Sequence, residues 1–145
     1  MKYKLTDVKI NFMGKTLFQI EAVKCFGDIV KGQKGGFIEK ESNLSQGGNA
    51  WVYGNAWVRG NAKVYGNAKV KGNADYLVIG PIGSRNDITT FFKTANNDIK
   101  VSCGCFTGTI EEFLEKVNET HGNNNYAKEY KTAVEIAKIH IFGGE

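Results

Sequence analysis

Residues 48–74 read GNAWVYGNAWVRGNAKVYGNAKVKGNA and repeat the six-residue phrase G-N-A-x-V-x. Six residues is too short a period for helix–turn–helix repeats, and it does not fit the heptads of a coiled coil. Because side chains alternate between the two faces of an extended chain, Ala and Val share one face and the variable positions share the other. Gly and Asn tolerate positive φ, so Gly-Asn is suited to the corners. The sequence therefore predicts short strands around a narrow Ala/Val interior.

The variable positions of the repeat are aromatic or basic. The stretch contains Arg59 and three lysines but no acid, so its charge of +4 equals the formal net charge of the whole chain. Aromatic residues and Arg concentrate at subunit interfaces, and we predict an interface at Trp51, Tyr53, Trp57 and Tyr65. Two alternatives remain open. The face binds nucleotides or nucleic acid, with Arg59 as a ligand-binding residue, or it is simply solvated.

The pattern V-x-G-N-A-x resembles the hexapeptide repeat of left-handed parallel β-helices, which has an aliphatic residue first and a small residue fifth. GGFIEKESNLSQ (35–46) followed by GNAWVYGNA (48–56) also resembles the opening of hexapeptide-repeat proteins common in bacteriophages and prophages. The resemblance implies coils of 18 residues, which would place Trp51 over Lys69 and Tyr53 over Lys71. Fewer than two such coils are present, so we expect flanking caps and self-association.

The predicted fold is mainly β, with three parts. Residues 1–36 are expected to form a β-rich N-terminal cap with a hairpin turn at Met13-Gly14. Residues 37–79 are expected to form the short left-handed parallel β-helix. Residues 80–145 are expected to form a small C-terminal α+β domain containing a hairpin and two helices.

Local signals define the elements of that C-terminal part. The hairpin is predicted to turn at Asn96-Asn97-Asp98. Thr109 and Glu112 have the spacing of a capping box, and the helix that they begin is predicted to end at His121-Gly122. A second helix is expected from about Tyr126 to His140.

The bulk composition excludes several classes of protein. No stretch approaches the roughly 18 consecutive apolar residues that span a bilayer, and MKYKLTDVKINF lacks the apolar run of a secretory signal. Three cysteines cannot all pair with one another, which favours a reducing cytoplasm. Cys103 and Cys105 have no histidine near them in the sequence, so we assign both a structural role and predict no metal site and no cofactor.

A second candidate region follows the repeat at residues 79–86, IGPIGSRN. Gly83 and Ser84 leave backbone amides unobstructed, and Arg85 supplies a planar donor fork suited to phosphate. The segment lacks the spacing of a phosphate loop or a dinucleotide fold, and a plain strand corner with a surface Arg is the competing interpretation. We predict ligand binding by Gly83, Ser84 and Arg85.

The strand after this turn extends the predicted ligand site. It contains Phe91, Phe92 and Lys93 within ten residues of Arg85. Because adjacent residues on a strand face opposite ways, one Phe is expected in the core and the other is expected to be free to stack on a base or a partner. All three residues are included in the predicted ligand site.

The resemblance also raises an enzymatic interpretation. Many hexapeptide-repeat proteins are acyltransferases with a catalytic His, and others are carbonic anhydrases with three zinc-binding His. This chain has two histidines, His121 and His140, and both lie outside the repeat. We therefore predict no catalytic residues and no enzymatic activity.

The function predicted from the sequence is that of a non-enzymatic, oligomeric binding protein. It would sequester a small anionic, nucleotide-like signalling ligand of a host cell, a counter-defence role that follows from the resemblance to phage proteins alone. One alternative is a structural or protein-interaction module, either an oligomerising scaffold or an inhibitor of a host protein. The other is a degenerate hexapeptide acyltransferase. Nucleic acid is a less favoured partner, and no membrane partner is predicted.

Overall fold

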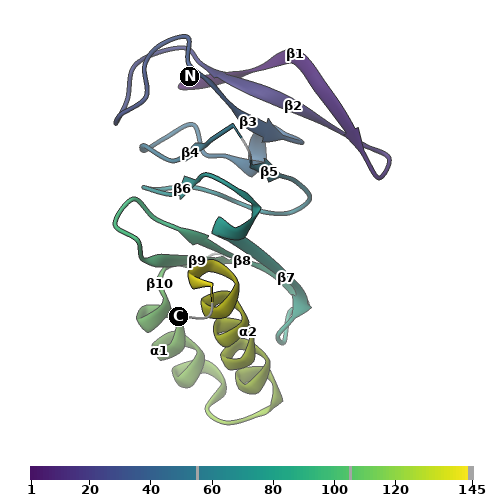
Figure 1. The fold of residues 1–145 in the computed structure, drawn as a ribbon. Coiled ribbons are helices and arrows are strands. Elements are labelled where there is room, and N and C mark those ends of the chain that lie inside the picture. The colour runs from purple at the N-terminus through teal and green to yellow at the C-terminus, as the bar shows by residue number, and fades with distance from the viewer. Residues whose placement is uncertain (55, 105, 144–145) are drawn as a thin grey trace. The chain divides into compact units, whose positions relative to one another are not determined.

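The computed structural model describes residues 1–54, 56–104 and 106–143 (Figure 1). The chain forms two compact units, Met1–Asn73 (unit 1) and Ala74–Glu145 (unit 2). The three-part division predicted at residues 36 and 79 stays a prediction.

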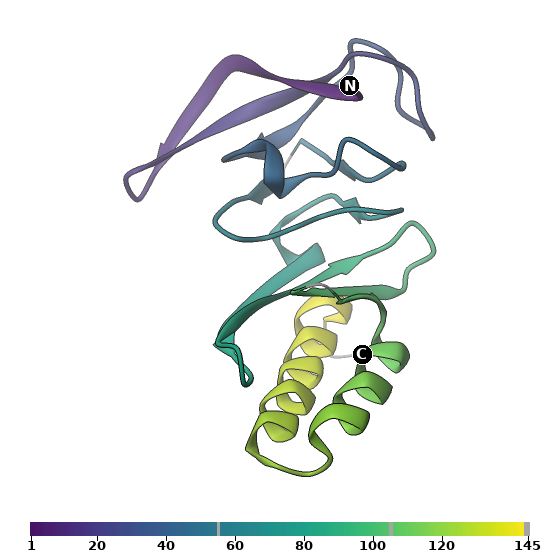
Figure 2. The same ribbon diagram turned by 180° about the vertical axis from the view of Figure 1, so that it is seen from behind.

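Unit 1 begins with a hairpin of two long strands, β1 (Tyr3–Phe12) and β2 (Lys15–Ala22), seen in purple in Figure 2. The turn predicted at Met13-Gly14 is confirmed, and both residues have positive φ, 50° and 80°. β2 pairs antiparallel with β3 (Lys34–Ile38), which pairs in parallel with β5 (Trp57–Val58). The result is a mixed sheet in the order β1-β2-β3-β5.

The rest of the repeat contributes short elements. β4 (Trp51–Val52) and β6 (Lys69–Val70) form a separate two-stranded parallel pair. Two 3₁₀ turns, η1 (Glu41–Asn43) and η2 (Asn73–Asp75), follow β3 and β6 in the chain.

The predicted left-handed parallel β-helix is wrong. Across the described residues the sheets are mixed or antiparallel, and they form no solenoid. Among residues 1–54, 56–104 and 106–143, parallel pairing is limited to two residue pairs in β3–β5, two in β4–β6 and a bridge between Leu44 and Val64. The strands of the repeat are only two residues long, so they cannot build continuous parallel ladders. Longer antiparallel strands before and after the repeat form most of the sheet structure.

Some residue-level expectations for the repeat are nevertheless confirmed. Each of its Ala and Val residues from Ala50 to Val70 is at most 2% exposed, as expected for an interior of small side chains. Trp51 pairs with Lys69 at the expected separation of 18 residues. Earlier pairs are 20 residues apart, for instance Ile38 with Val58.

Lys2 connects the start of the chain to the repeat. Its ammonium group donates hydrogen bonds to the carbonyl oxygens of Ala50 (2.7 Å), Gly47 (3.2 Å) and Gly48 (3.5 Å). The same group lies 5.0 Å from the centroid of the Phe26 ring, and the residue is 1% exposed. Burial lowers the pKa of Lys2 to about 8, and the charge of Lys24 acts in the same direction.

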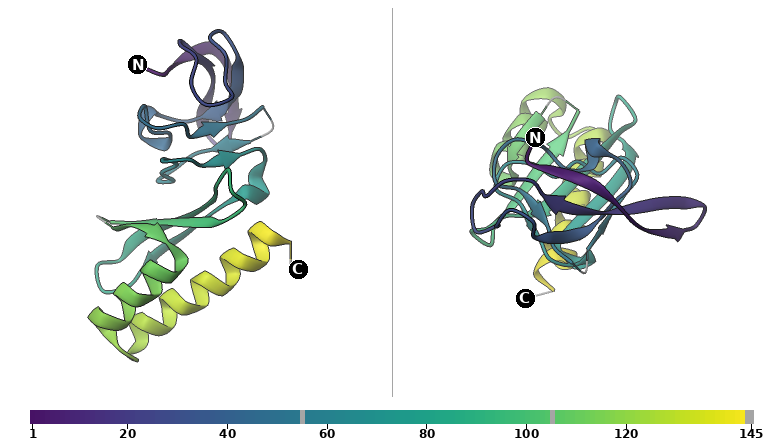
Figure 3. Two further views of the ribbon diagram at one scale, coloured as in Figure 1. Left: turned by 90° about the vertical axis from the view of Figure 1, so that its left-hand side faces the viewer. Right: turned by 90° about the horizontal axis from the view of Figure 1, so that it is seen from above.

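Unit 2 is an antiparallel sheet with two helices on one face (Figure 3, left). Its strands lie in the order β10-β9-β8-β7 and are β7 (Tyr76–Ile82), β8 (Asp87–Lys93), β9 (Ile99–Cys103) and β10 (Phe106–Thr109). The helices are α1 (Ile110–His121) and α2 (Asn125–Phe142). Consecutive strands pair with one another, so the sheet is built from hairpins.

The helix boundaries in unit 2 follow the capping signals. The predicted capping box is confirmed: Thr109 Oγ1 accepts from the Glu112 amide (3.1 Å), and Glu112 Oε1 accepts from the Thr109 amide (2.9 Å). α1 ends at His121, with Gly122 as its C-cap, as predicted. Asn124 caps α2 by accepting from the Ala127 amide at 3.0 Å.

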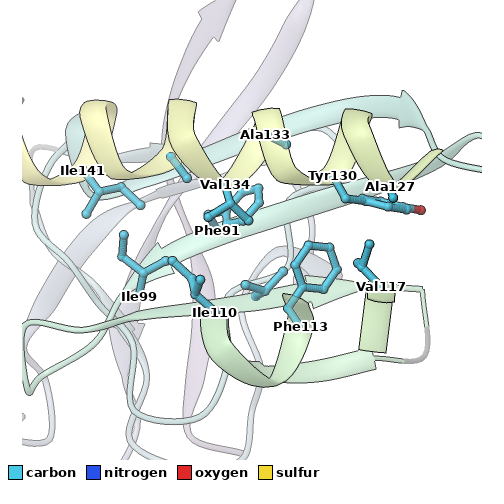
Figure 4. Close-up of a cluster of buried hydrophobic side chains, with 12 residues drawn as sticks. Phe91, Ile99, Ile110, Phe113, Val117, Ala127, Tyr130, Ala133, Val134 and Ile141 are labelled. Atoms are coloured by element: carbon cyan, nitrogen blue, oxygen red, sulfur yellow. The ribbon is translucent and has the colours of Figure 1, made fainter. Parts of the chain in front are cut away.

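The core of unit 2 lies between the helices and the sheet (Figure 4). Phe113 of α1 is at its centre and makes edge contacts with Phe91 and with Tyr130. The buried members are Phe91, Ile99, Val101, Ile110, Phe113, Val117, Ala127, Tyr130, Ala133, Val134, Ala137 and Ile141. This core fixes α1 and α2 against the strand ends that form the candidate site.

Candidate ligand-binding cleft

The residues predicted to bind a ligand or to form an interface belong to two different units. Arg59 and the predicted interface residues are in unit 1, whereas the turn at Gly83–Arg85 and the strand with Phe91, Phe92 and Lys93 are in unit 2.

Trp51 corrects the prediction of an exposed aromatic surface on the repeat. It is 1% exposed, and its ring makes edge contacts with Tyr3 (centroids 6.4 Å apart) and Phe26 (5.4 Å). Burying a large aromatic side chain is strongly favourable, and the N-terminal segment provides the apolar partners. Trp51 is therefore a core residue and is not available to a partner subunit.

The aromatic residues Trp57 and Tyr65 and the cation Arg59 are half-buried, whereas Lys63 and Lys71 are exposed. Trp57 meets the Phe12 ring edge-on (5.4 Å), and the Arg59 guanidinium lies over the same ring (4.6 Å). Arg59 is thus engaged by the β1–β2 hairpin. Tyr65 also interacts within the structure.

Tyr53 has cations close to its ring, as the resemblance implied for Lys71. The ammonium groups of Lys69 and Lys71 lie 5.9 Å and 5.8 Å from the ring centroid, and the Tyr53 hydroxyl donates to Asp28 Oδ1 at 3.3 Å. Burial raises the pKa of Tyr53 to about 12, and the Asp28 carboxylate adds to this effect. The ring and the hydroxyl of Tyr53 therefore both have partners within unit 1.

The prediction that one of Phe91 and Phe92 is buried and the other is free to stack is also corrected. Phe91 and Phe92 are both fully buried, and they lie on β8, an inner strand of the sheet. Neither ring is accessible to a ligand. Lys93 is half-buried at the end of β8, in register with Ile99.

The turn at Gly83–Arg85 lies on a cleft within unit 2. The cleft has a volume of about 700 Å³ and is formed by the β7–β8 turn, the β9–β10 turn, α1 and one residue of α2. It is lined by Ser84, Arg85, Asp87, Cys103, Gly104, Phe106, Phe113, Lys116, Val117, Thr120, His121 and Tyr130. This volume is in the range of small-molecule sites. Of the predicted ligand residues, Ser84 and Arg85 line the cleft, and Gly83 contacts its wall.

Two cations of the cleft have no acidic partner in the part of the chain that the structure describes. Arg85 and Lys116 are exposed, and neither forms an ion pair with any residue that the structure describes. The one carboxylate in the lining, Asp87, is half-buried, and its Oδ1 accepts from the Ile88 amide at 3.1 Å. The cleft therefore has two available positive charges against one negative charge.

The inner wall is formed by Tyr130, which is 7% exposed. Thr89 Oγ1 donates to the Cys103 thiol (3.2 Å), and that thiol donates in turn to the Tyr130 hydroxyl (3.9 Å). The His121 ring stacks on the Tyr130 ring, with centroids 6.1 Å apart and planes at 23°. Burial raises the pKa of Tyr130 to about 12, with Cys103, Asp87 and Glu129 acting in the same direction. Tyr130 is therefore a neutral hydrogen-bonding group at neutral pH.

Sequence reasoning missed most of the cleft. Lys116, His121 and Tyr130 come from two helices, and Cys103 comes from a strand end for which only a structural role was predicted. One feature of the sequence could have indicated part of the cleft lining: Lys116 and Thr120 are four residues apart and so share a face of α1. Cys105, the other cysteine assigned a structural role, lies outside the described residues.

Within residues 1–54, 56–104 and 106–143, no group of three or more His, Cys, Asp or Glu side chains is arranged to hold a metal ion. Among the same residues, neither α1 nor α2 is both long enough and apolar enough to cross a bilayer.

Comparison with known proteins gives no family. No family model matches the chain, and no curated protein matches it. The resemblance to hexapeptide-repeat proteins of phages is therefore corrected on two grounds: no family model supports it, and the sheets are not those of a parallel β-helix.

Proposed function

We propose that unit 2 is a binding module for a small anionic ligand, held in the cleft between the β7–β8 turn and α1. The observation that carries this proposal is the placement of Arg85 and Lys116 on one cleft without acidic partners among the described residues. A guanidinium presents a planar pair of donors to a phosphate or carboxylate, and an ammonium group adds a second charge.

The cleft is suited to more than an isolated anion. Phe106 and Val117 provide apolar surface beside the cations, and about 700 Å³ is enough for a ligand of nucleotide size. We therefore keep the nucleotide-like ligand expected from the sequence and place it in this cleft. A binding role is proposed in preference to catalysis, and the cytoplasmic location predicted from the cysteines goes with it. The counter-defence role is not proposed, because it depended on the resemblance to phage proteins.

The test is native mass spectrometry of the purified protein, followed by thermal-shift measurements with inorganic phosphate, ribose 5-phosphate and the four common nucleoside 5′-monophosphates. We expect at least one of these anions to raise the melting temperature of the wild-type protein, because a ligand that binds only the folded state stabilises it. Arg85→Gln and Lys116→Gln should each reduce that shift. Lys131→Gln, a change at an exposed lysine of α2 outside the cleft, should leave it unchanged. No shift with any of the anions would refute the proposal.

A second candidate function is self-association through the outer face of α2. Ile136 and Ile139 are 45% and 63% exposed and lie three residues apart, so they share one side of the helix. Pairing of this side with a second copy would remove both side chains from water. Light scattering should then give a dimer for the wild type and for Lys131→Glu but a monomer for Ile139→Glu. A monomeric wild type at high concentration would exclude this candidate.

A further inference from the structure

Unit 1 carries a group of aromatic side chains on the outer face of its mixed sheet, to which β1, β3 and β5 belong (Figure 1). Phe37 of β3 and Trp57 of β5 are paired in register. The residues that follow them, Ile38 and Val58, are fully buried. Because side chains alternate between the two faces of a strand, Phe37 and Trp57 point away from the interior. The Phe12 ring of β1 meets Trp57 edge-on, with centroids 5.4 Å apart. All three rings are half-buried, so part of each is accessible to a ligand.

Arg59 lies beside these rings as a cation without an anionic partner among the described residues. Its guanidinium is 4.6 Å from the centroid of the Phe12 ring, its side chain is half-buried, and it forms no ion pair with them. The carboxylate of Glu39, which reaches the neighbouring Gly60, is already engaged. Its Oε2 lies 3.5 Å from Lys15 Nζ, and its Oε1 accepts from the Gly60 amide at 2.7 Å. A guanidinium is always charged and can only donate hydrogen bonds, so Arg59 is available to a phosphate group.

The exposed surface of unit 1 is strongly basic. Nine of its lysines are exposed, whereas only three of its acids are, namely Asp7, Asp28 and Glu41. Of the nine lysines, Lys15 and Lys34 form ion pairs within the unit. With twelve Lys and Arg against five Asp and Glu, unit 1 has a net charge of +7. A surplus of this size attracts a polyanion, whose charges repeat along its length, better than it attracts a single small anion.

We infer that this face of unit 1 binds single-stranded nucleic acid, whose bases stack on Trp57 and Phe37 while Arg59 and the exposed lysines contact its phosphates. Stacking on aromatic side chains requires bases whose faces are accessible, and in a duplex those faces are covered by neighbouring base pairs. An anionic membrane fits less well, because half-buried rings cannot insert into a bilayer. The inference concerns unit 1 and does not depend on the ligand proposed for unit 2.

The experiment measures the binding of the protein to a fluorescently labelled oligothymidylate by anisotropy. A probe of about 20 nucleotides exceeds the usual site size of such surfaces. We expect wild type to bind this single strand more tightly than a duplex of the same length, with an affinity that falls as salt is added. No binding of the oligothymidylate would overturn the inference. Equal or tighter binding of the duplex, of polyglutamate or of vesicles containing an anionic phospholipid would also overturn it, because charge alone would then explain the attraction.

The fluorescence of Trp57 gives a direct test of stacking. The other tryptophan, Trp51, is 1% exposed and out of reach of a base. We expect the oligothymidylate to quench the tryptophan fluorescence of wild type. Trp57→Phe keeps an aromatic ring, so it should retain most of the affinity but lose the quenching. Trp57→Leu should weaken binding by at least about fivefold, the effect of losing one stacked base. Quenching that persists in Trp57→Phe would place the bases elsewhere and would overturn the inference.

Charge variants test the role of Arg59. Arg59→Gln should weaken binding and reduce the slope of log affinity against log salt concentration by about 0.7, the share of one phosphate contact on a single strand. Lys31→Gln is the matched control, since it removes the same charge from an exposed residue in the loop between β2 and β3, and it should weaken binding less. Arg85→Gln, in the cleft of unit 2, should leave binding unchanged. Equal effects of Arg59→Gln and Lys31→Gln, or a larger effect of Arg85→Gln, would overturn the inference.

Discussion

Gly83 belongs to the β7–β8 turn and lies against the hydroxyl of Tyr130. Its φ is +80°, and a Cβ atom at this position would be 1.8 Å from the Tyr130 oxygen. Its amide donates to Glu129 Oε1 at 3.0 Å, which ties the turn to α2. The absence of a side chain at residue 83 therefore allows Tyr130 to reach the cleft wall.

Gly83→Ala should consequently be costly. We expect it to lower the free energy of unfolding by about 2–4 kcal/mol, from positive φ together with the overlap at Tyr130. Gly143→Ala is the matched control, since Gly143 also has positive φ (70°) in unit 2, but among the described residues no heavy atom other than those of its chain neighbours lies within 4 Å of its Cβ position. The control should lose only about 1–2 kcal/mol. Denaturant unfolding measures both values, and equal losses would contradict the close contact with Tyr130.

Lys2 gives a pH dependence that can be tested at a single residue. Its folded-state pKa of about 8 lies below the ordinary value of 10.5, so the unfolded chain binds more protons between these two values. Stability contributed by this group therefore rises as the pH increases from about 8 towards 10. Above about pH 10 the tyrosines act in the opposite direction, because burial raises the pKa of Tyr53 and Tyr130.

Lys2→Met should remove this rise. We expect the free energy of unfolding of wild type to increase from about pH 8 to about pH 9.5 relative to that of the variant. The variant should be less stable at every pH, because three backbone carbonyls lose their donor. Tryptophan fluorescence is the suitable probe, since Trp51 and Trp57 both lie in unit 1. Parallel pH profiles for the two proteins would argue against a lowered pKa.

At the scale of elements, α1 depends on the capping box at its start. Thr109 and Glu112 exchange two hydrogen bonds. The backbone amide of Thr109, and then its side chain, lower the pKa of the Glu112 carboxyl. Because the folded-state pKa is depressed, the contribution of Glu112 is present above its unfolded pKa and is lost as the pH falls through the folded value.

Thr109→Ala should therefore lower the stability of unit 2 by about 1 kcal/mol. Far-UV circular dichroism reports this loss directly, because both α-helices belong to unit 2. Thr107→Ala, an exposed position two residues earlier in β10, is the control and should have a smaller effect. A Thr109→Ala variant as stable as this control would show that the cap contributes little.

The same elements show what the sequence could and could not predict. Helix limits at Thr109 and His121 and the turn at Met13-Gly14 were predictable, because each is decided by a few neighbouring residues. The Ala and Val positions were also predictable as interior, since they depend on strand alternation. The sheet arrangement was not, because the repeat does not reveal that its strands stop after two residues.

The cleft was unpredictable for a different reason. Arg85 was found because it follows glycines in a local pattern. Lys116 and Tyr130 join it only after α1 and α2 pack on the sheet, and no local pattern marks that contact. Trp51 was misplaced for a related reason, because residues 3 and 26 that cover it are distant in the sequence.

At the scale of the whole molecule, the two units have opposite net charge. Unit 1 contains twelve Lys and Arg against five Asp and Glu, and unit 2 contains seven against ten, which gives +7 and −3. An anion that binds unit 2 is thus attracted by the local arrangement of Arg85 and Lys116 and not by the net charge of the unit. Because both side chains are exposed, added salt should screen this attraction.

The hydrogen bond from Lys2 to Ala50 has a consequence for the order of folding. It joins residues 48 positions apart, and the bond from the Tyr3 hydroxyl to the Leu44 carbonyl oxygen spans 41. In unit 2 the sheet pairs consecutive strands and the helices form from local contacts, although the packing of α2 on β7 also joins distant residues. Contacts between distant residues form slowly, because the intervening chain must be ordered first. In stopped-flow refolding, the helical circular dichroism of unit 2 should therefore recover before the tryptophan fluorescence of unit 1, and the start of the chain should be among the last segments to reach its final place.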